Sequence, residues 1–398
     1  MVTDYYLPTL GGVQTVIKAH REELERAGHE VRVFAPARAA SADPGVVRLP
    51  TARGFAPDGY PFAWPPRRVA EVLRHELAAM QADVVHVHTE MFAALGAFRA
   101  ARDLGLPIVQ TMHGRIDVYT RAVLPAAPVT TTILAALHRR GIPHRASGID
   151  GSAAYARTRT ARRMWRLMVS QADAADRVIV PSAHFASKLL AQGVRTPITV
   201  LSNGLEDSVL DAIGEPSPGL VEHDGPLRVL WCGRLSPEKR PEVFVEAIAE
   251  LDGVRAEMYG DGIARGRIAR LAARLPSDRL RVHGAVPQRR VLDAMRTADV
   301  LVSSSLDFDN QPMVLLEGVA AGLPVVIADP DLAEMLPADG HMIADTPDAR
   351  GLARALRMLR DDPQRRIEMR RAAIAHRSIT AQRTHRDGLV AVYRDVIG

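Results

Sequence analysis

Cysteine and lysine are scarce in this sequence. Cys232 is the single cysteine, so no internal disulfide can form, which is typical of a protein that works in a reducing cytoplasm. No run of about 18 apolar residues occurs, so no transmembrane helix is expected. The opening residues MVTDYYLPTL contain neither a basic nor an apolar segment, so no secretory signal is expected either. These absences predict a cytoplasmic location.

Only three of the 51 basic residues are lysines, namely Lys18, Lys188 and Lys239. An ammonium group binds ligands differently from a guanidinium group, so each lysine is a candidate functional residue. With 46 acidic residues the net charge is +5, and a basic surface suits phosphate-bearing ligands or anionic lipid. The chain has neither a long basic block nor a low-complexity tail, so nucleic acid is not a predicted partner.

Short apolar runs alternate along the chain with segments of helical period. This alternation predicts parallel sheets covered by helices on both faces, hence an α/β fold. A chain of 398 residues is too long for one ordinary core, so we predict two doubly wound, Rossmann-like domains. The expected strands are residues 30–36, 83–89, 107–113, 176–182 and 198–204, and then 227–233, 255–262, 280–286, 299–305 and 324–329.

The border between the domains is predicted at residues 206–226, which lose the helical period and collect proline, glycine and acidic residues. A long surface loop within one domain is the alternative. The predicted domains are therefore 1–205 and 227–379. The amphipathic segment 380–398 is expected to form a helix that packs back on the first domain. Residues 2–8 resemble the end of a first strand whose leading residues are missing.

Residues 231–242, WCGRLSPEKRPE, join the end of an expected strand to a helix. Gly233 permits a tight turn, and Arg234 and Lys239 lie in the loop. Ligands of doubly wound sheets bind at the carboxyl ends of the strands. Two cations at such a place can hold a diphosphate and neutralise the charge of a leaving group. A solvated basic loop is the alternative interpretation.

Residues 309–317, DNQPMVLLE, place a carboxylate at each end of a loop that turns into a helix. The start of a helix offers unpaired backbone N–H groups and the positive end of its dipole, which suits an anion. Asp309 and Glu317 would then bind groups other than the anion. Sugar hydroxyls are the natural candidates.

Three further turns carry weaker signals. Gly260, in the turn MYGDG, could lie under a nucleotide base or ribose, or could simply close the turn. The backbone of Val286, in HGAVPQRRV, could pair with the edge of a base. Gly11 and Gly12 open a helix and would let the backbone approach a phosphate, although they form no GxGxxG fingerprint.

His113 follows an expected strand, and His86 and His88 lie near the end of another strand of the same domain. An ordinary core or surface histidine is the alternative for each. The chain has neither Hx3H nor HExxH spacing, so no metal site is predicted. It has no GxSxG motif either, so a serine nucleophile is not expected.

Taken together, these stretches resemble the retaining family 4 glycosyltransferases of GT-B fold. GGVQ, CGRLSPEKR and DNQPMVLLEGVAAGLPVV carry the resemblance over nearly the whole chain. It implies transfer of a hexose from a UDP- or GDP-sugar to a hydroxyl acceptor, with retained anomeric configuration and no obligatory metal or other cofactor. The family's E-x7-E pattern falls on Asp309 and Glu317, of which the second binds the donor ribose and the first approaches the sugar.

The resemblance also assigns the remaining site residues. Asp309 is one methylene shorter than the usual glutamate, and FDNQPM replaces the commoner Gly-Phe-Gly. The catalytic residues implied are His113, Arg234, Lys239 and Asp309. The donor-binding residues implied are Gly11, Gly12, Arg234, Lys239, Gly260, Val286, Asp309, Asn310, Gln311, Pro312, Met313, Val314 and Glu317. On the acceptor side the residues implied are His88, Glu90 and Arg115.

The stretches VHVHTEMFAALGA and VQTMHGRIDVY look most like the glycolipid-synthesising branch of the family, which implies a lipid acceptor. Residues 157–171 combine five arginines with an apolar face and are typical of a helix that rests on anionic lipid, with Trp165 at the interface. A core-packed helix is the alternative. A lipid acceptor and such a helix together predict peripheral contact with the inner face of the membrane.

Two other functions remain open from the sequence alone. A nucleotide-sugar 2-epimerase shares the fold and the donor site but needs no acceptor. A non-catalytic partner would bind a nucleotide sugar without transferring it. The presence of Arg234, Lys239, Glu317 and His113 together favours an enzyme over such a partner.

Overall fold

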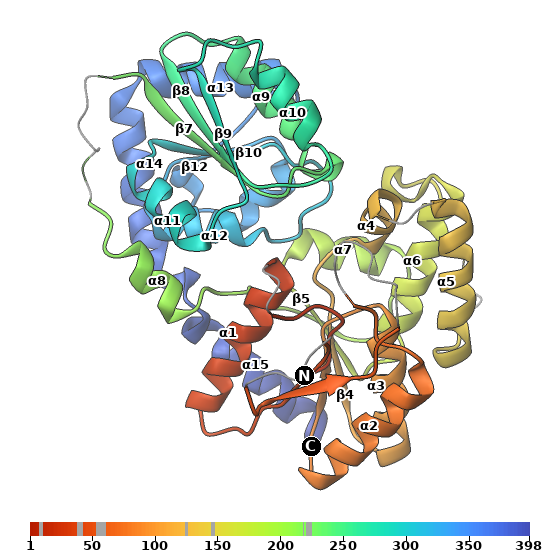
Figure 1. The fold of residues 1–398 in the computed structure, drawn as a ribbon. Coiled ribbons are helices and arrows are strands. Elements are labelled where there is room, and N and C mark those ends of the chain that lie inside the picture. The colour runs from red at the N-terminus through yellow and green to blue at the C-terminus, as the bar shows by residue number, and fades with distance from the viewer. Residues whose placement is uncertain are drawn as a thin grey trace. The chain divides into compact units, whose positions relative to one another are not determined.

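The computed structural model describes residues 1–7, 11–37, 43–52, 61–123, 126–144, 148–217, 219 and 225–398. The chain divides into two compact units, which are shown in Figure 1. Unit 1 comprises Met1–Ser202 and His385–Gly398, and unit 2 comprises Asn203–Thr384. Parallel strands and helices make up both units, so the predicted α/β class with two Rossmann-like halves is confirmed. The assignment of acceptor and donor roles to these units stays a prediction.

The described strands of unit 1 pair in parallel. Val2 bridges both Phe34 and Val87, so the opening residues occupy the place of a strand between β1 and β3. β4 is buried at every residue, as expected for a strand that helices cover on both faces. The strands are β1 (Val33–Pro36) and β2 (Val46–Leu49), which pair with each other, and β3 (Val85–Val87), β4 (Ile108–Thr111), β5 (Arg177–Val180) and β6 (Ile198–Val200), which pair in that order.

The helices of unit 1 pack on this sheet through their apolar faces. Leu73 and Phe98, for example, belong to one buried cluster with Val85 and Ile108 of the sheet. Among the described helices of the chain, none combines the length and apolar character needed to span a bilayer. The helices are α1 (Gly12–Arg26), α2 (Pro66–Ala79), α3 (Phe92–Leu104), α4 (Ile116–Val123), α5 (Ala127–Gly141), α6 (Arg159–Ala172), α7 (Ala183–Ala191) and most of α15 (Gln382–Ile397).

The prediction that Trp165 lies at a lipid surface is wrong. Trp165 is fully buried in α6, and its ring packs against Phe185 of α7. Met164 and Met168 of the same helix face are also fully buried. On the other side of the helix, Arg163 donates hydrogen bonds to α5. The stretch is therefore a core-packed helix, because its apolar residues are spaced to cover one face of unit 1.

Helix α15 contacts unit 1 through its apolar residues. Leu389 and Val392 share a buried cluster with Val109 of β4 and Ile179 of β5. The hydroxyl of Tyr393 lies 2.6 Å from Nδ1 of His86, which ties the helix to β3 as well. The final segment of the chain thus completes the covering of this sheet.

Unit 2 contains a six-stranded parallel sheet with β7 near its centre. Figure 1 shows α9, α10 and α13 on one side of this sheet and α11, α12 and α14 on the other. The strand order is β12-β11-β10-β7-β8-β9. The strands are β7 (Leu227–Cys232), β8 (Val254–Tyr259), β9 (Leu280–Gly284), β10 (Val300–Ser303), β11 (Val325–Ile327) and β12 (His341–Ile343).

Most helices of unit 2 follow the carboxyl ends of these strands, whereas α8 precedes β7 and α14 follows α13 directly. A short 3-10 turn, Pro237–Lys239, lies in the loop between β7 and α9. The helices are α8 (Asp207–Ile213), α9 (Pro241–Ala249), α10 (Arg265–Ala272), α11 (Gln288–Thr297), α12 (Met313–Ala320), α13 (Ala349–Asp361) and α14 (Pro363–His376).

The predicted linker, 206–226, is not wholly irregular. Its first part forms α8, whose Val209, Leu210 and Ile213 are buried. These apolar residues have helical spacing, which the surrounding acidic residues and the following prolines obscure in the sequence. Residues 218 and 220–224 of the predicted linker lie outside the described residues.

Candidate active site

The carboxyl ends of β7 and β8 lie side by side in unit 2, and their loops are joined by backbone hydrogen bonds. The N–H of Gly233 donates to the carbonyl of Tyr259 at 3.0 Å, and the N–H of Leu235 donates to the carbonyl of Asp261 at 2.9 Å. Gly260 has φ 139°, and a Cβ added there would lie 1.8 Å from the carbonyl oxygen of Gly233. Only glycine allows this approach, so Gly260 has a structural role in shaping the loop that contains Arg234.

Arg234 follows Gly233 in that loop. Its Nη2 donates to Oε1 of Glu238 at 2.9 Å, and the hydroxyl of Ser236 donates to the same oxygen at 2.6 Å. The side chain of Glu238 is 3% exposed whereas that of Arg234 is 45% exposed. The buried carboxylate therefore orients a guanidinium whose remaining surface faces solvent, where an anion can reach it.

Lys239 ends the 3-10 turn of the same loop. Its Nζ lies 2.6 Å from Oδ1 of Asp309, and the two side chains are 18% and 11% exposed. Nζ also lies 5.5 Å from the centre of the Phe308 ring. The hydroxyl of Ser304, just past β10, donates to the carbonyl of Lys239 at 2.8 Å. Two predicted site residues that are far apart in the sequence are thus in direct contact.

The two carboxylate oxygens of Asp309 differ in their contacts. Its Oδ2 is buried and has no hydrogen-bond partner among the described residues. A buried carboxylate oxygen normally accepts at least one hydrogen bond. Lys239 holds Oδ1, and the ligand-binding role of Asp309 stays a prediction.

The segment between Asp309 and α12 is buried. The Oε1 of Gln311 accepts a hydrogen bond from the backbone N–H of Asn203 at 2.7 Å, and Asn310 is also buried. Helix α12 begins after Pro312 without a side-chain cap. The backbone N–H groups of Met313 and Val314 therefore lie in the first turn, where a helix has no acceptors of its own and carries its positive dipole end.

Glu317 lies one turn further along α12 and is nearly buried. Its Oε1 accepts a hydrogen bond from Nε2 of Gln288, the first residue of α11, at 2.7 Å. Burial raises the pKa of Glu317 to about 7, and the hydrogen bond from Gln288 offsets part of that rise. Burial raises the pKa of the Cys232 thiol well above its usual value, and the nearby charge of Glu317 raises it further. The thiol is therefore protonated at pH 7. The predicted Val286 lies two residues before Gln288.

In unit 1, His113 follows β4 and contacts His88. Nε2 of His113 lies 3.0 Å from Nδ1 of His88, and the two rings are stacked with centres 5.2 Å apart. Burial lowers the pKa of His113 to about 4, so its imidazole is neutral at pH 7. A neutral ring can donate one hydrogen bond and accept another.

The other residues assigned to the acceptor side have different surroundings. Glu90 is buried, and its Oε1 has no partner among the described residues. Arg115 forms a two-bond ion pair with Asp117, at 3.1 and 2.8 Å, and its guanidinium lies over the Tyr155 ring. The side chains of this pair are both 4% exposed. This contact gives Arg115 a part in the packing of unit 1, and its role toward an acceptor stays a prediction.

Gly11 and Gly12 lie at the start of α1. Gly11 is extended, with φ −175°, and its carbonyl accepts from the backbone N–H and the hydroxyl of Thr15, both at 3.1 Å. A Cβ at Gly11 would lie 2.7 Å from the side-chain oxygen of Gln14. Gly12 is exposed, so the backbone at the start of α1 lies at the surface, as a phosphate site requires. Residues 9 and 10 of the motif lie outside the described residues.

Comparison with protein families decides the identity of the chain. The model described as Glycosyltransferase Family 4 matches residues 10–209, and the model described as Glycosyl transferases group 1 matches residues 226–362. The chain belongs to glycosyltransferase family 4. The predicted enzyme class, a glycosyltransferase, is confirmed by these matches.

Curated relatives of this family 4 glycosyltransferase cover most of its length. A GDP-mannose-dependent alpha-mannosyltransferase of Mycobacterium tuberculosis is 27% identical over 338 residues, which are 83% of this chain and 78% of that protein. An alpha-monoglucosyldiacylglycerol synthase of Streptococcus pneumoniae is 25% identical over 342 residues, which are 82% of this chain and 70% of that protein. The resemblance inferred from the motifs is thus confirmed.

Solved structures confirm the GT-B fold of this glycosyltransferase. HepE of Anabaena in complex with UDP superposes with a TM-score of 0.70 at 16% identity and covers 99% of this chain and 98% of its own. Sucrose-phosphate synthase of Thermosynechococcus elongatus gives a TM-score of 0.73 at 17% identity, over 97% of this chain and 93% of that one.

Two polar residues of the glycosyltransferase site were missed by sequence reasoning. Glu238 orients Arg234, and Gln288 binds Glu317. Glu238 stands four residues after Arg234 in the quoted motif, so the spacing of opposite charges was an available signal. The sequence around Gln288 contains no such signal, because a glutamine at the start of a helix is an ordinary surface residue in most proteins.

Proposed function

We propose that the protein transfers a hexose from a UDP- or GDP-sugar to a hydroxyl group of a lipid acceptor, with retention of anomeric configuration. The contact between Lys239 and Asp309 carries this proposal, because it joins the basic loop after β7 to the acid that opens the α12 segment. The pair offers a cation for a phosphate and a carboxylate oxygen for a sugar hydroxyl at one place.

The donor diphosphate is proposed to bind to Arg234 and Lys239, with the first turn of α12 beside them. Charge grows on the departing phosphate as the bond to the anomeric carbon breaks, and fixed cations stabilise that charge. Glu317 is proposed to accept hydrogen bonds from the ribose hydroxyls, in the position that Gln288 partly satisfies without ligand. His113 is proposed to hydrogen-bond a hydroxyl of the transferred sugar.

Retention is proposed to follow from attack on the same face that the leaving group departs from. The acceptor oxygen forms a bond to the anomeric carbon as the bond to the diphosphate breaks, and the acceptor proton passes to the leaving phosphate oxygen. Asp309 is proposed to bind a sugar hydroxyl through Oδ2 and not to attack the anomeric carbon, because the ion pair between Oδ1 and Lys239 at 2.6 Å offsets the charge of the carboxylate and so makes it a weaker nucleophile. Capture of a glycosylated enzyme side chain during turnover would contradict this route.

A nucleotide-sugar donor and a lipid acceptor are supported by the relatives. HepE is also known in complex with UDP-glucose, the Mycobacterium enzyme is named for GDP-mannose, and the Streptococcus enzyme is named for a glucosyldiacylglycerol.

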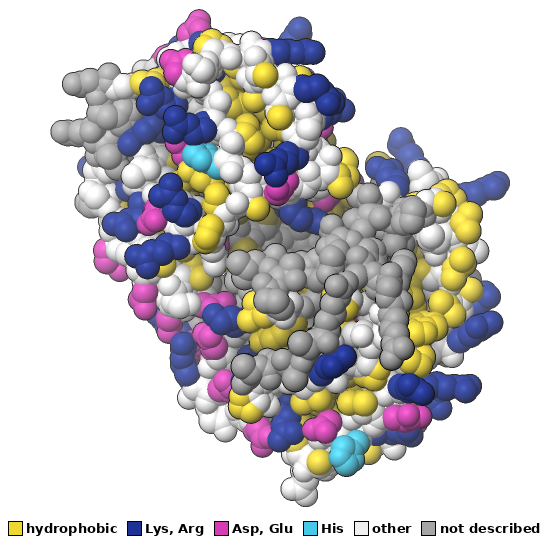
Figure 2. Space-filling view, in the orientation of Figure 1, with side chains coloured by type: hydrophobic (Ala, Val, Ile, Leu, Met, Phe, Trp, Pro, Cys, Tyr) yellow, Lys and Arg dark blue, Asp and Glu magenta, His cyan; other side chains and the backbone are white. Residues whose placement is uncertain are grey.

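Helix α5 supports peripheral contact with a membrane. Val129 and Ile133, one turn apart, are 60% and 55% exposed, and Arg140 lies two turns beyond Ile133 on the same face. Figure 2 shows hydrophobic and basic side chains next to each other along the edge of unit 1 where α5 lies in Figure 1. An exposed face of this kind suits anionic lipid, and each arginine near such a surface contributes about 1 kcal/mol.

The contact is tested with vesicles that contain anionic lipid. The protein should co-sediment at low salt and be released at high salt. Replacing Val129 and Ile133 with serine should weaken binding, whereas Leu190→Ser should not, although Leu190 is 56% exposed on another helix of unit 1. Equal weakening by both changes, or no co-sedimentation at low salt, would contradict the assignment to α5.

The transfer reaction is tested with a panel of labelled UDP- and GDP-sugars and diacylglycerol or an inositol lipid as acceptor. Label should pass into the lipid phase, and the product linkage should have the donor's anomeric configuration. Isomerised free donor without transfer would indicate the epimerase alternative. Donor binding without any new product, with every acceptor offered, would indicate a non-catalytic binding protein.

A further inference from the structure

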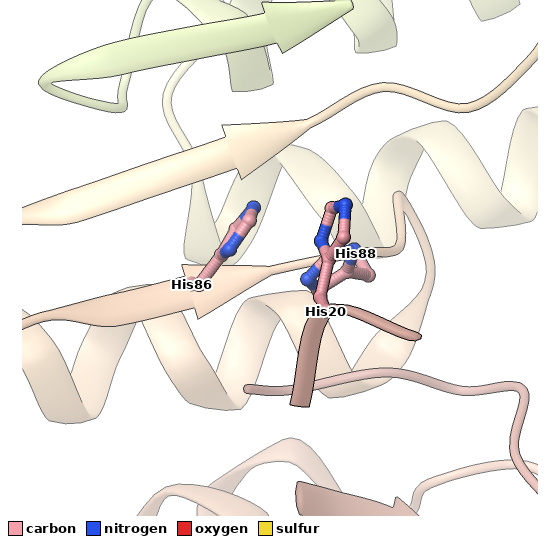
Figure 3. A group of neighbouring side chains, drawn as sticks. All are labelled: His20, His86 and His88. Carbon is pink, nitrogen blue, oxygen red and sulfur yellow. The ribbon is translucent and has the colours of Figure 1, made fainter. Parts of the chain in front are cut away.

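A cluster of three histidines lies in unit 1 beside His113, and it includes His88, which the sequence assigned to the acceptor side. His86 belongs to β3 and His88 follows it by two residues, so both side chains project to the same face of the strand. His20 comes from α1, and Figure 3 shows its ring beside that of His88. One nitrogen from each ring lies within 4.8 Å of the others, and all three residues are buried.

Two imidazole nitrogens of this cluster form no hydrogen bond with the described residues. Nδ1 of His20 and Nε2 of His88 are buried and have no hydrogen-bond partner among the described residues. Buried polar side-chain atoms are nearly always hydrogen-bonded, so a pair of unpartnered imidazole nitrogens in one cluster points to a missing ligand.

The other nitrogens of His88 and His86 have hydrogen-bond partners. Nδ1 of His88 lies 3.0 Å from Nε2 of His113. Nε2 of His86 lies 2.6 Å from the hydroxyl of Thr111, and its Nδ1 lies 2.6 Å from the hydroxyl of Tyr393. A ligating histidine usually keeps one such outer hydrogen bond, which holds the ring in orientation. His86 would keep one of its two hydroxyl contacts and exchange the other for the metal.

We propose that His20, His86 and His88 bind a divalent zinc ion. Three imidazole nitrogens suit zinc, whereas magnesium and calcium prefer oxygen ligands. Zinc–nitrogen bonds are about 2.0–2.1 Å long, so a tetrahedral ion draws its ligand nitrogens to about 3.4 Å from one another. The nitrogens now lie within 4.8 Å of one another, so rotation of the imidazole rings would have to bring them to that spacing.

The proposed ion would connect α1 to β3. Helix α1 starts at Gly12, so the ion would hold the helix whose first turn is the predicted phosphate site. Through His88 it would also influence the ring of His113. This is a structural site and not part of the transfer chemistry, so its test needs no activity measurement and stands apart from the proposed function.

The experiment uses the full chain, stripped of metal with a chelator and dialysed. Inductively coupled plasma mass spectrometry after addition of zinc should give about one ion per chain. Cobalt, added as a spectroscopic probe in place of zinc, should give visible absorption typical of tetrahedral nitrogen ligation. Zinc, but not magnesium, should raise the melting temperature, because an ion that binds only the folded state stabilises it.

Variants separate the cluster from other histidines. His20→Leu removes a buried unpartnered nitrogen, so the metal-free variant should fold at least as stably as the metal-free wild type. It should lose the stoichiometric zinc, the cobalt spectrum and the zinc-dependent rise in melting temperature. His29→Gln, at an exposed histidine just after α1, should keep all three.

Retention of stoichiometric zinc by His20→Leu would overturn the proposal. So would its loss from His29→Gln, which would locate the ion on the surface. Failure of the wild-type protein to bind zinc in the micromolar range would overturn it as well. If His20→Leu does not fold, His88→Gln is measured in the same way, and loss of zinc from that variant is the supporting result.

Discussion

Replacement of Lys239 by methionine removes the ammonium group while keeping most of the aliphatic side chain. The wild-type contact between Nζ and Oδ1 of Asp309 is 2.6 Å, and the side chains are only 18% and 11% exposed. If Lys239 stabilises charge on the departing phosphate, its loss should cost about 2.7–4 kcal/mol in the transition state, which is about a 10²–10³-fold loss of kcat. The donor KM should rise much less, because the contact strengthens as the bond breaks.

The same change also affects folding, and the two effects must be separated. Asp309 would lose its cation while it remains nearly buried. Breaking a buried pair costs about 3–5 kcal/mol, and the partial exposure of Lys239 lowers that figure. The double variant with Asp309→Asn removes the unpaired charge, so its melting temperature should recover toward that of the wild type. Its turnover should not recover.

The assay is transfer of labelled sugar to a lipid acceptor, with kcat and donor KM measured separately. Lys18→Met is the matched control, since Lys18 is a surface lysine paired with Glu22 at 3.4 Å. Its turnover should stay at the wild-type level. Turnover of Lys239→Met within a few-fold of wild type would refute the reasoning, whatever happens to stability.

Three further predictions concern unit 2. Glu317→Ala should weaken binding of free UDP or GDP in calorimetry while Asp309→Ala should not, because ribose is present in the free nucleotide and the sugar is not; equal losses would contradict this division. Binding of free nucleotide should strengthen as pH rises from 6 to 8. The pKa of Glu317 is raised to about 7, so its side chain is protonated below that pH and accepts ribose hydrogen bonds as a carboxylate only above it. Glu317→Gln should abolish this pH dependence. Gly260→Ala should lower the free energy of unfolding by about 1–3 kcal/mol, since the new Cβ would collide with the carbonyl of Gly233. Gly266→Ala in α10 is the control, because the nearest atom to its new Cβ is 4.0 Å away. That change should be neutral or stabilising in thermal unfolding.

Much of the fold could be predicted from the sequence, because buried parallel strands are continuous apolar runs. The strands that were missed, β2 and β12, have a different signature. β2 is mostly half-buried, and β12, at the edge of its sheet, has one half-buried, one buried and one exposed residue. An edge strand has one neighbour and partial cover, so its sequence lacks the uninterrupted apolar character on which the prediction depends.

The candidate site was predicted in part. The motifs identified Lys239 and Asp309 separately, but their contact joins loops after β7 and β10, which the sheet order brings together. Local spacing carries no information about such a pairing. The same limit applies to the zinc site proposed in unit 1, where His86 and His88 are visible as a pair and His20 reaches them only through the packing of α1.

The two acids that enclose the DNQPMVLLE segment illustrate what only the structure adds. Both were assigned to hydroxyl groups of the donor on the basis of spacing. Asp309 lies against an ammonium group, whereas Glu317 lies against the neutral amide of Gln288. Burial without a cation makes ionisation of Glu317 depend on what binds beside it, because hydroxyl donors stabilise the charged form. Nucleotide binding should therefore release a proton near pH 7, and calorimetry in buffers of different ionisation enthalpy would detect that release in the wild type and its absence in Glu317→Gln.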